Sequence, residues 1–222
     1  MNTFSKEYFN NPLRARYAMT EVLRSEIMRL PSGSKLLDLG CGDMRLLLEI
    51  SKMRPDLQLH GVDIGAIPST NNNIHFTNAD VTTFIADTEY QLVLAVDILE
   101  HLLCPERLVN TAWKSLASEG RFYTTVPSVT KLLLFGDENF FSDYSHIRPF
   151  SCKSMSRLLF DHGFDVRSTE LVGQSKRSII RLGYYLMRGI VTLNATYLNA
   201  VIRMVAGTAV ETVAQKKIEV AC

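Results

Sequence analysis

The stretch that decides the fold is Leu36-Leu37-Asp38-Leu39-Gly40-Cys41-Gly42-Asp43, in which a short apolar run passes directly into a turn with glycines. A predicted helix, Leu46 to Ser51, follows the turn. Gly40 and Gly42 carry no side chain that would hold a ligand away from the backbone, and a helix N-terminus attracts polar ligands. The turn therefore predicts a site for a nucleotide-like cofactor. The dinucleotide fingerprint Gly-x-Gly-x-x-Gly needs glycine where Arg45 stands, so this alternative is the weaker one.

Outward from this turn, short apolar runs alternate with helical or polar stretches. Such alternation is typical of βαβ units and predicts an α/β, Rossmann-like fold: a seven-stranded, mostly parallel sheet with helices on both faces and the final strand antiparallel. The predicted strands are Lys35 to Leu39, Leu57 to Val62, Ile74 to Thr77, Leu92 to Val96, Arg121 to Val126, Phe164 to Leu171 and Ala209 to Lys216.

Helices are predicted on both sides of this core. Apolar residues follow a helical period from Asn11 to Leu30, and Ser151 to Asp161 reads as a helix capped by its first serine. Gly173 to Gly207 is too long for a hairpin loop, so we expect a helical insertion before the last strand. At this length we expect one domain, divided into an N-terminal helical segment (1–33), a cofactor-binding core (34–172), the insertion (173–207) and a last strand with a tail (208–222).

The composition excludes several classes of protein. An apolar fraction of 46% and a charged fraction of 21% exclude a disordered or fully membrane-embedded chain. Lys and Arg number 24 against 23 Asp and Glu, so no global field favours nucleic acid. The 4 cysteines show no metal or disulfide spacing, and the first residues lack a signal peptide's apolar core. A cytoplasmic protein is expected, one that could lie against the inner face of a membrane.

Acidic residues follow the predicted strands in order, with Asp63 after the second, Asp80 after the third and Asp97-Ile98-Leu99-Glu100-His101-Leu102 after the fourth. Pro105 and Leu108 come next, and His146-Ile147-Arg148-Pro149-Phe150-Ser151 precedes the helix that ends at Gly163-Phe164. With these motifs the chain resembles the class I S-adenosylmethionine-dependent methyltransferases, closest to their small-molecule, type 11-like branch. The resemblance covers roughly Lys35 to Leu171. One departure is Met44, where many members carry a third glycine.

The resemblance implies S-adenosyl-L-methionine as the cofactor. Asp38 and Gly40 would face its methionine portion, Asp63 would accept hydrogen bonds from the ribose hydroxyls, and Asp80 would bind the adenine amino group. The full set of implied cofactor-binding residues is Asp38, Gly40, Cys41, Gly42, Asp63, Ile64, Asp80, Val81, Asp97 and Ile98. Taken singly, Asp63 and Asp80 fit ordinary turn chemistry after a strand equally well.

His101 and His146 are the candidates for a catalytic general base, because imidazole titrates near neutral pH. Some relatives that resemble this stretch use a divalent metal, and Asp97, Glu100, His101 and His146 could form such a site. The alternative, in which Glu100 and His101 begin and orient a helix, is favoured, so no metal is assigned. The loop 136–150 supplies the candidate substrate-binding residues Phe140, Phe141 and Tyr144, unless it is an aromatic-packed surface loop.

The insertion has a basic amphipathic pattern. On a helical wheel Arg177, Arg181 and Arg188 share one side, and the opposite side carries Ile179, Leu182, Leu186, Ile190 and Leu193. A lid packed on the domain is the favoured interpretation, and a peripheral membrane contact through 175–205 is the alternative.

The sequence thus predicts a methyltransferase that acts on a small-molecule, glycan or lipid-linked acceptor. The alternatives are a non-catalytic S-adenosylmethionine-binding scaffold and a metal-assisted RNA 2′-O-methyltransferase. The oligomeric state and the acceptor atom do not follow from the sequence.

Overall fold

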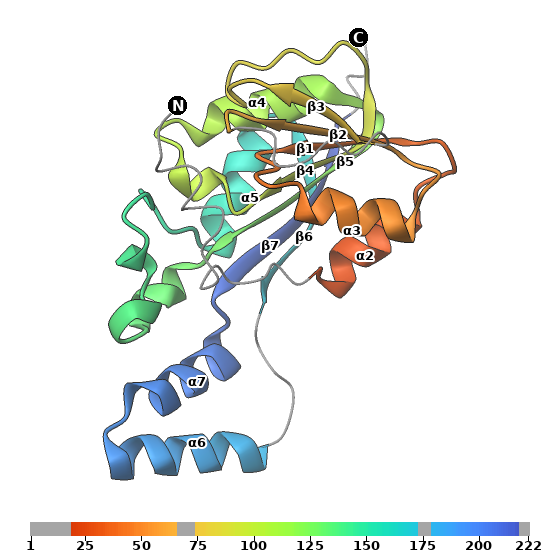
Figure 1. The fold of residues 1–222 in the computed structure, drawn as a ribbon. Coiled ribbons are helices and arrows are strands. Elements are labelled where there is room, and N and C mark those ends of the chain that lie inside the picture. The colour runs from red at the N-terminus through yellow and green to blue at the C-terminus, as the bar shows by residue number, and fades with distance from the viewer. Residues whose placement is uncertain (1–18, 66–73, 173–178, 218–222) are drawn as a thin grey trace.

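The computed structural model describes residues 19–65, 74–172 and 179–217 of the chain. Its centre is a seven-stranded sheet in the order β3-β2-β1-β4-β5-β7-β6 (Figure 1). The strands are β1 (Lys35–Leu39), β2 (Gln58–Asp63), β3 (Ile74–Asn78), β4 (Tyr90–Val96), β5 (Leu116–Pro127), β6 (Phe164–Val172) and β7 (Ala209–Lys216). Strands β1 to β5 pair in parallel, and β7 is antiparallel to both β5 and β6. The predicted mostly parallel sheet with an antiparallel last strand is confirmed.

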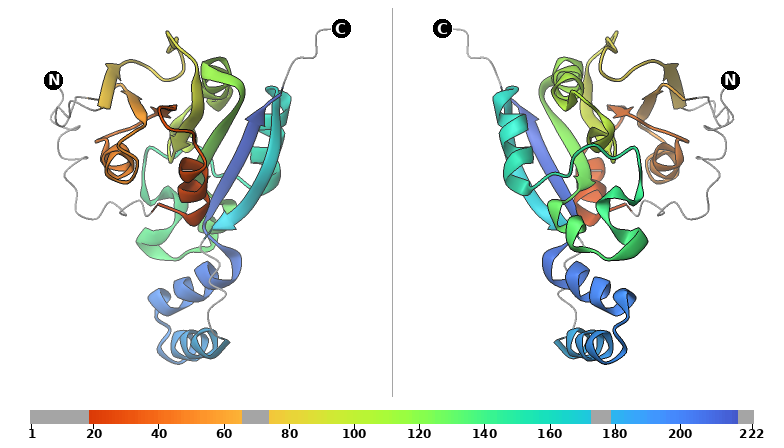
Figure 2. Two further views of the ribbon diagram at one scale, coloured as in Figure 1. Left: turned by 90° about the vertical axis from the view of Figure 1, so that its right-hand side faces the viewer. Right: turned by 90° about the vertical axis from the view of Figure 1, so that its left-hand side faces the viewer.

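Helices cover both faces of the sheet, as Figures 1 and 2 show. On one face α4 (Pro105–Ser115) and α5 (Cys152–Asp161) share a core with Leu37, Val93 and Phe122. On the other, α2 (Glu21–Met28) and α3 (Arg45–Met53) share a second core with Leu36, Leu92 and Tyr123. Neighbouring strand residues such as Leu36 and Leu37 enter opposite cores because side chains alternate along a strand. Apolar runs without a polar alternation are therefore what this doubly covered sheet requires.

The N-terminal helix differs from its prediction. Of the predicted range 11–30, residues 11–18 lie outside the described residues, and α2 spans only Glu21–Met28. Met19 and Thr20 are not helical, because Thr20 is extended and its hydroxyl accepts a hydrogen bond from the Leu23 N–H as an N-cap. The prediction of one continuous helix through these two residues is wrong. The predicted cap of α5 is confirmed, since Ser151 and Ser154 form a reciprocal capping box.

Short 3₁₀ turns lead from β4 and β5 toward the next helices. They are η1 (Leu99–His101), η2 (Val129–Leu133), η3 (Gly136–Glu138) and η4 (Phe140–Ser142). Because parallel strands bring their carboxyl ends to one edge of the sheet, η1 after β4 and η2 to η4 after β5 leave the sheet at the same edge as the turn between β1 and α3. The candidate site residues follow these strand ends.

The insertion between β6 and β7 forms two helices, α6 (Ile179–Thr192) and α7 (Ala195–Ala206), which pack against each other as a hairpin. The hairpin projects away from the sheet (Figures 1 and 2). Leu186, Ile190 and Leu193 are exposed, so the favoured interpretation of this apolar stripe as core packing is wrong for these residues. Arg177 lies outside the described residues, as do the side chains of Ile179, Arg181 and Leu182. In the described part of the chain, no helix has the length and apolar character needed to cross a bilayer.

Candidate active site

The turn from β1 to α3 is built on left-handed backbone. Gly40, Gly42 and Met44 have φ angles of 88°, 53° and 60°. The turn is fixed to the end of β2, because the N–H groups of Gly40 and Cys41 donate to the Val62 carbonyl at 2.8 and 3.2 Å. The predicted glycine turn between a strand and a helix is thus present. Met44 is a non-glycine residue in this conformation, which carries a steric penalty.

Two glycines make room for the protein's own side chains. A Cβ at Gly40 would lie 2.9 Å from Cγ1 of Ile98, so Ile98 from the β4 edge packs directly on the turn. A Cβ at Gly61 in β2 would lie 2.7 Å from Sγ of Cys41. Gly61 is a supporting residue that the sequence analysis missed, because its role depends on a contact with a neighbouring strand. Cys41 and Ile98 therefore serve as packing supports of the turn.

Asp38, at the end of β1, is the most constrained acidic residue of the turn. It is buried, and its Oδ1 has no hydrogen-bond partner within the described structure. Burial, and then the nearby charge of Asp63, raise the pKa of Asp38 to about 7. A buried carboxylate without a donor is costly, and a cationic or hydrogen-bond-donating ligand would relieve that cost. The amino group of S-adenosylmethionine is such a donor, so this residue fits the cofactor that the sequence implies.

Asp63 and Asp80 both make hydrogen bonds within their own turns. Asp63 accepts from the N–H of Gly42 at 2.9 Å and from that of Gly65 at 2.7 Å. Asp80 accepts from the N–H and the hydroxyl of Thr82, both at 2.8 Å, and these bonds lower the pKa of Asp80. Hydrogen bonds within the local turns thus account for part of the bonding of each carboxylate. The bond from the Gly42 N–H also links Asp63 to the glycine turn. Exposed Ile64 follows Asp63, and buried Val81 follows exposed Asp80.

Glu100 is the most unusual residue after β4. Its side chain is 1% exposed, and neither carboxylate oxygen has a hydrogen-bond partner in the described residues. Burial and the charge of Asp97 raise the pKa of Glu100 well above its ordinary value. Asp97 itself is exposed and has a φ angle of 50°. Glu100 and His101 lie in the 3₁₀ turn η1, ahead of α4, so they do not begin the α-helix that follows.

The structure brings His101 and His146 together from separate segments. Their ring centroids are 4.8 Å apart, and one ligating atom from each of Glu100, His101 and His146 lies within 4.8 Å of the others. The Ile147 N–H donates to the Glu100 carbonyl at 2.8 Å, which holds the later loop against η1. Asp97, the fourth residue considered for a metal, is not part of this described cluster.

Second contacts orient both imidazoles. Ser145 Oγ donates to Asp143 Oδ1 at 2.6 Å and lies 2.9 Å from His101 Nδ1, so Nδ1 carries the hydrogen in that contact. His146 Nδ1 donates to the Phe140 carbonyl at 2.7 Å. Neutral imidazoles bound in this way carry their lone pair on Nε2, the arrangement typical of a general base or a metal ligand. The sequence analysis missed Asp143 and Ser145, whose polar types are common in any loop.

The three aromatic candidates for substrate binding lie in different environments. Phe140 is fully buried and stacks near His146, with ring centroids 4.7 Å apart. Phe141 and Tyr144 are 61% and 83% exposed. Phe140 therefore supports the loop and His146, while Phe141 and Tyr144 are open to a ligand.

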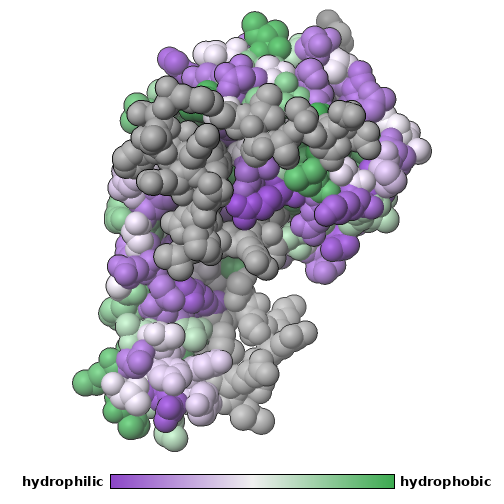
Figure 3. All heavy atoms as spheres, viewed as in Figure 1, coloured by the Kyte–Doolittle hydropathy of each residue, from purple (hydrophilic) through white to green (hydrophobic). Residues whose placement is uncertain are grey.

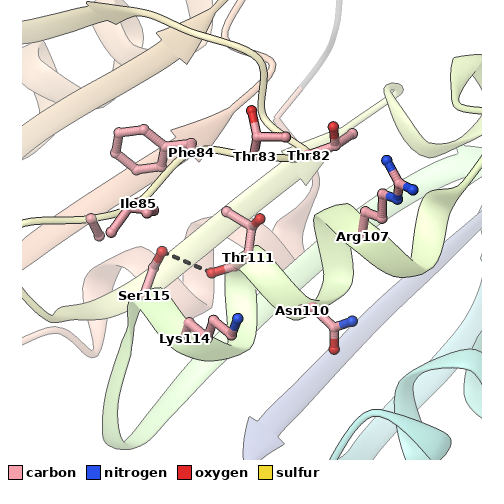
Figure 4. Close-up of a pocket in the computed structure, with 10 residues that line it drawn as sticks. Thr82, Thr83, Phe84, Ile85, Arg107, Asn110, Thr111, Lys114 and Ser115 are labelled. Carbon is pink, nitrogen blue, oxygen red and sulfur yellow. Dashed lines mark hydrogen bonds between the residues drawn. The ribbon is translucent and has the colours of Figure 1, made fainter.

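A cleft of about 460 Å³ lies between residues 82–86 and α4. Figure 4 shows Arg107, Asn110 and Lys114 along α4, with Phe84 and Ile85 on the facing segment. None of the predicted site residues lines this cleft.

The sheet order, the antiparallel β7 and the glycine turn define the Rossmann-like fold of class I methyltransferases. A family model described as "Methyltransferase domain" matches residues 14–169. The chain therefore belongs to this methyltransferase domain family, whose cofactor is S-adenosylmethionine. No curated protein matches the chain in sequence.

Solved structures share the fold at low sequence identity. The [4+2]-cyclase SpnF is 18% identical, with 94% of this chain and 85% of that chain covered and a TM-score of 0.64. Coclaurine N-methyltransferase, bound to N-methylheliamine and SAH, is 17% identical, with 88% and 71% covered and a TM-score of 0.59. Phosphoethanolamine N-methyltransferase 2 of Haemonchus contortus is 14% identical, with 97% and 57% covered and a TM-score of 0.64. These likenesses establish the fold alone.

Proposed function

We propose that this protein is an S-adenosylmethionine-dependent methyltransferase that acts on a small-molecule, glycan or lipid-linked acceptor. The observation that carries the proposal is the buried carboxylate of Asp38, which has an unpartnered oxygen at the glycine turn. An ammonium group there would supply the missing donor and would favour the ionised form of Asp38. The solved relatives named above include proteins that act on small molecules, which agrees with this class of acceptor.

When bound, S-adenosylmethionine supplies an activated methyl group. Attack by the acceptor is an in-line displacement, so the main task of the protein is to hold the two reactants in line and exclude water. In this proposal the β1–α3 turn and the ends of β2 to β4 position S-adenosylmethionine. Phe141 and Tyr144 contact the acceptor, and His101 or His146 accepts the acceptor's proton at Nε2. The Asp143–Ser145 pair keeps His101 oriented for that transfer.

Calorimetry with S-adenosylmethionine and S-adenosylhomocysteine tests the binding half of the proposal. Wild-type protein should bind both, and Asp38→Asn should lower the affinity about a hundredfold because the ionic partner is lost. Asp161→Asn, on the far helix α5, is the matched control and should bind like wild type. Equal affinity of wild type and Asp38→Asn would contradict the cofactor assignment.

Turnover separates an enzyme from a cofactor-binding scaffold. Methyl-labelled S-adenosylmethionine is incubated with panels of small-molecule, glycan and lipid acceptors, and transferred label is measured. Transfer that falls in His101→Ala or His146→Ala, with cofactor affinity retained, supports the enzyme. Tight cofactor binding without transfer on any panel favours the scaffold.

A second candidate, metal-assisted methyl transfer such as RNA 2′-O-methylation, is favoured by one observation. Glu100 offers two buried oxygens without hydrogen-bond partners, and Oε1 lies 3.9 Å from His101 Nε2. With His146 these atoms form a mixed oxygen and nitrogen donor set that suits a divalent metal. A metal held there would act as a Lewis acid on an acceptor hydroxyl. Calorimetry with Mn²⁺ or Mg²⁺ tests this candidate, because Glu100→Gln should abolish metal binding while cofactor binding stays unchanged. Absence of metal binding by wild type would rule it out.

A further inference from the structure

Exposed hydrophobic side chains concentrate in two regions of the described chain. Of its 19 large hydrophobic side chains classed as exposed, 14 lie either in the loop 129–147 or in the α6–α7 hairpin. The loop contributes Val129, Leu132, Leu133, Phe135, Phe141, Tyr144 and Ile147, and the hairpin contributes Tyr184, Leu186, Met187, Ile190, Val191, Leu193 and Val205. We call these side chains the apolar surface. Figure 3 shows hydrophobic atoms at the tip of the projecting hairpin. Soluble proteins rarely leave so many hydrophobic groups exposed without a partner.

Hydrogen bonds and an ion pair connect the α6–α7 hairpin to the loop 129–147. Asn199 of α7 is 1% exposed and pairs with both backbone groups of Phe135: its Oδ1 accepts from the N–H at 2.8 Å and its Nδ2 donates to the carbonyl at 3.0 Å. Arg203 and Glu138 form an ion pair at 2.9 Å beside it. The hairpin is therefore held against η2 and η3 by specific bonds, and its exposed face has a defined orientation relative to the loop.

The surface also lies at the functional edge of the sheet. Ala209, where β7 begins, pairs with Pro127 at the end of β5, and it also pairs with Val172 at the end of β6. The hairpin thus leaves the sheet at the edge where β1 and β4 deliver the candidate site residues. Phe141 and Tyr144 belong to the apolar surface and also flank His146 in the candidate acceptor region.

Charge distinguishes between the possible occupants of this surface. From Ile179 to Ala206 the two helices contain Arg181, Arg188 and Arg203 and no aspartate or glutamate. The loop 129–147 contains Lys131 and the acidic residues Asp137, Glu138 and Asp143, and Glu138 pairs with Arg203, so the basic character of the surface belongs to the hairpin. Arg188 is exposed beside Tyr197, with its guanidinium carbon 5.4 Å from the ring centre. Apolar side chains next to cations match the acyl chains and headgroups of an anionic bilayer. A second copy of the hairpin would bring like charges together.

We propose that the α6–α7 hairpin and the loop 129–147 dock on an anionic lipid bilayer. Ile190, Val191 and Leu193 enter the interface, and Arg188 contacts lipid phosphates. If the proposed methyltransferase function holds, this docking presents the acceptor region to an amphipathic acceptor carried by the membrane. Attachment is sensitive to salt because the contact of Arg188 with lipid phosphates is electrostatic, and it is reversible because the helices lie in the interface.

Vesicle sedimentation with the full chain tests the proposal. Wild-type protein should pellet with phosphatidylcholine vesicles that contain phosphatidylglycerol, should pellet weakly with phosphatidylcholine alone, and should be released by salt. The double variant Ile190→Ser/Val191→Ser should bind anionic vesicles at least tenfold more weakly, and Arg188→Glu several-fold more weakly. The control Met28→Ser/Ile85→Ser, which removes equally exposed side chains from other faces, should bind like wild type.

Three outcomes would overturn the docking proposal: no pelleting of wild type at low ionic strength, an equal loss in the control variant, or a lipid-free dimer that the Ile190→Ser/Val191→Ser variant dissociates. The third outcome would assign the surface to a second copy of the chain. Calorimetry with S-adenosylmethionine on the same preparations keeps the two proposals apart. Cofactor binding without vesicle binding contradicts only the docking, and vesicle binding without cofactor binding contradicts only the proposed function.

Discussion

The β1–α3 turn and the α6–α7 hairpin lie at the same edge of the sheet but are stabilised in opposite ways. At the turn, Cys41 and Met44 are buried, backbone N–H groups are bonded to β2, and a glycine is packed against Ile98. At the hairpin, Val191 and Leu193 are 77% and 86% exposed, and Asn199 is the buried polar link to the loop 129–147. The turn is thus complete within the chain except at Asp38, whereas the hairpin leaves a whole surface without a partner in the described structure. The turn therefore keeps its geometry through contacts within the chain, whereas the exposed face of the hairpin is open to a partner.

The largest expected effect is that of Asp38→Asn, compared with wild type, on the free energy of unfolding without cofactor. The folded-state pKa of Asp38, about 7, lies above its ordinary value of 3.8, so ionisation of this group lowers stability as the pH rises from 3.8 to 7. The variant should therefore be more stable than wild type above pH 7, by up to about 4 kcal/mol. The gain should shrink toward pH 5 and vanish near pH 4. Denaturant titrations at pH 5 and pH 8 check this. A stability difference between variant and wild type that does not depend on pH would contradict the proposed cause, the ionisation of a buried carboxyl group.

A smaller effect of the opposite sign is expected for Met44→Gly. Glycine relieves the left-handed strain at this position, roughly 1–2 kcal/mol, but it removes a side chain that is 1% exposed, which costs about 2–5 kcal/mol. The net result should be a loss of about 2 kcal/mol in chemical denaturation. A gain in stability would show that the buried methionine contributes little to the core around α3.

Leu193→Gly is the counterpart of that substitution in the hairpin. Leu193 has a φ angle of 50°, close to that of Met44, but its side chain is exposed. Relief of strain should therefore outweigh the added chain entropy of glycine, and stability should rise by about 0.5 kcal/mol. A thermal melt alongside Met44→Gly measures both. A clear loss of stability would mean that Leu193 packs against a partner in solution.

The smallest effect is expected for Ile190→Ser/Val191→Ser in the absence of lipid. Both side chains are exposed, so the free energy of unfolding should change by no more than about 0.5 kcal/mol. Leu47→Ser in α3, which is fully buried, serves as the comparison and should lose several kcal/mol. A large loss in the hairpin variant would remove the contrast between the two regions.

Much of the fold follows from local sequence signals. The order and approximate positions of the strands, the glycine turn and the Ser151 cap depend on side-chain periodicity and on residues adjacent in sequence, so the sequence alone predicts them. The strand bounds are predicted less well, since β5 begins at Leu116 and not at the predicted Arg121. The start of α2 differs from the prediction because the apolar period runs from Met19 to Leu23 across Thr20, whereas the Thr20 hydroxyl caps the N-terminus of the helix at that point.

The candidate site could be predicted only as a list of residues. Its members follow from their positions after the strands, but burial separates them in ways that composition does not encode. Phe140 and Phe141 are adjacent and chemically identical, yet one is buried beneath His146 and the other faces solvent. The orientation of His101 by Ser145, and the pairing of Asn199 with Phe135, connect segments that are remote in sequence.

The root of the hairpin has a consequence for how this protein could change over evolutionary time. Val172 and Ala209 face each other in the sheet, the Thr208 N–H bonds to the Val172 carbonyl at 3.0 Å, and a Cβ at Gly207 would lie 2.8 Å from that same oxygen. Strands β6 and β7 are thus hydrogen-bonded to each other up to the point where the inserted helices leave the sheet. Recombination at this seam could shorten, lengthen or exchange the segment without shifting the register of β6 and β7. The two helices between β6 and β7 are therefore free to differ in length and surface while the pairing of β6 with β7 is kept.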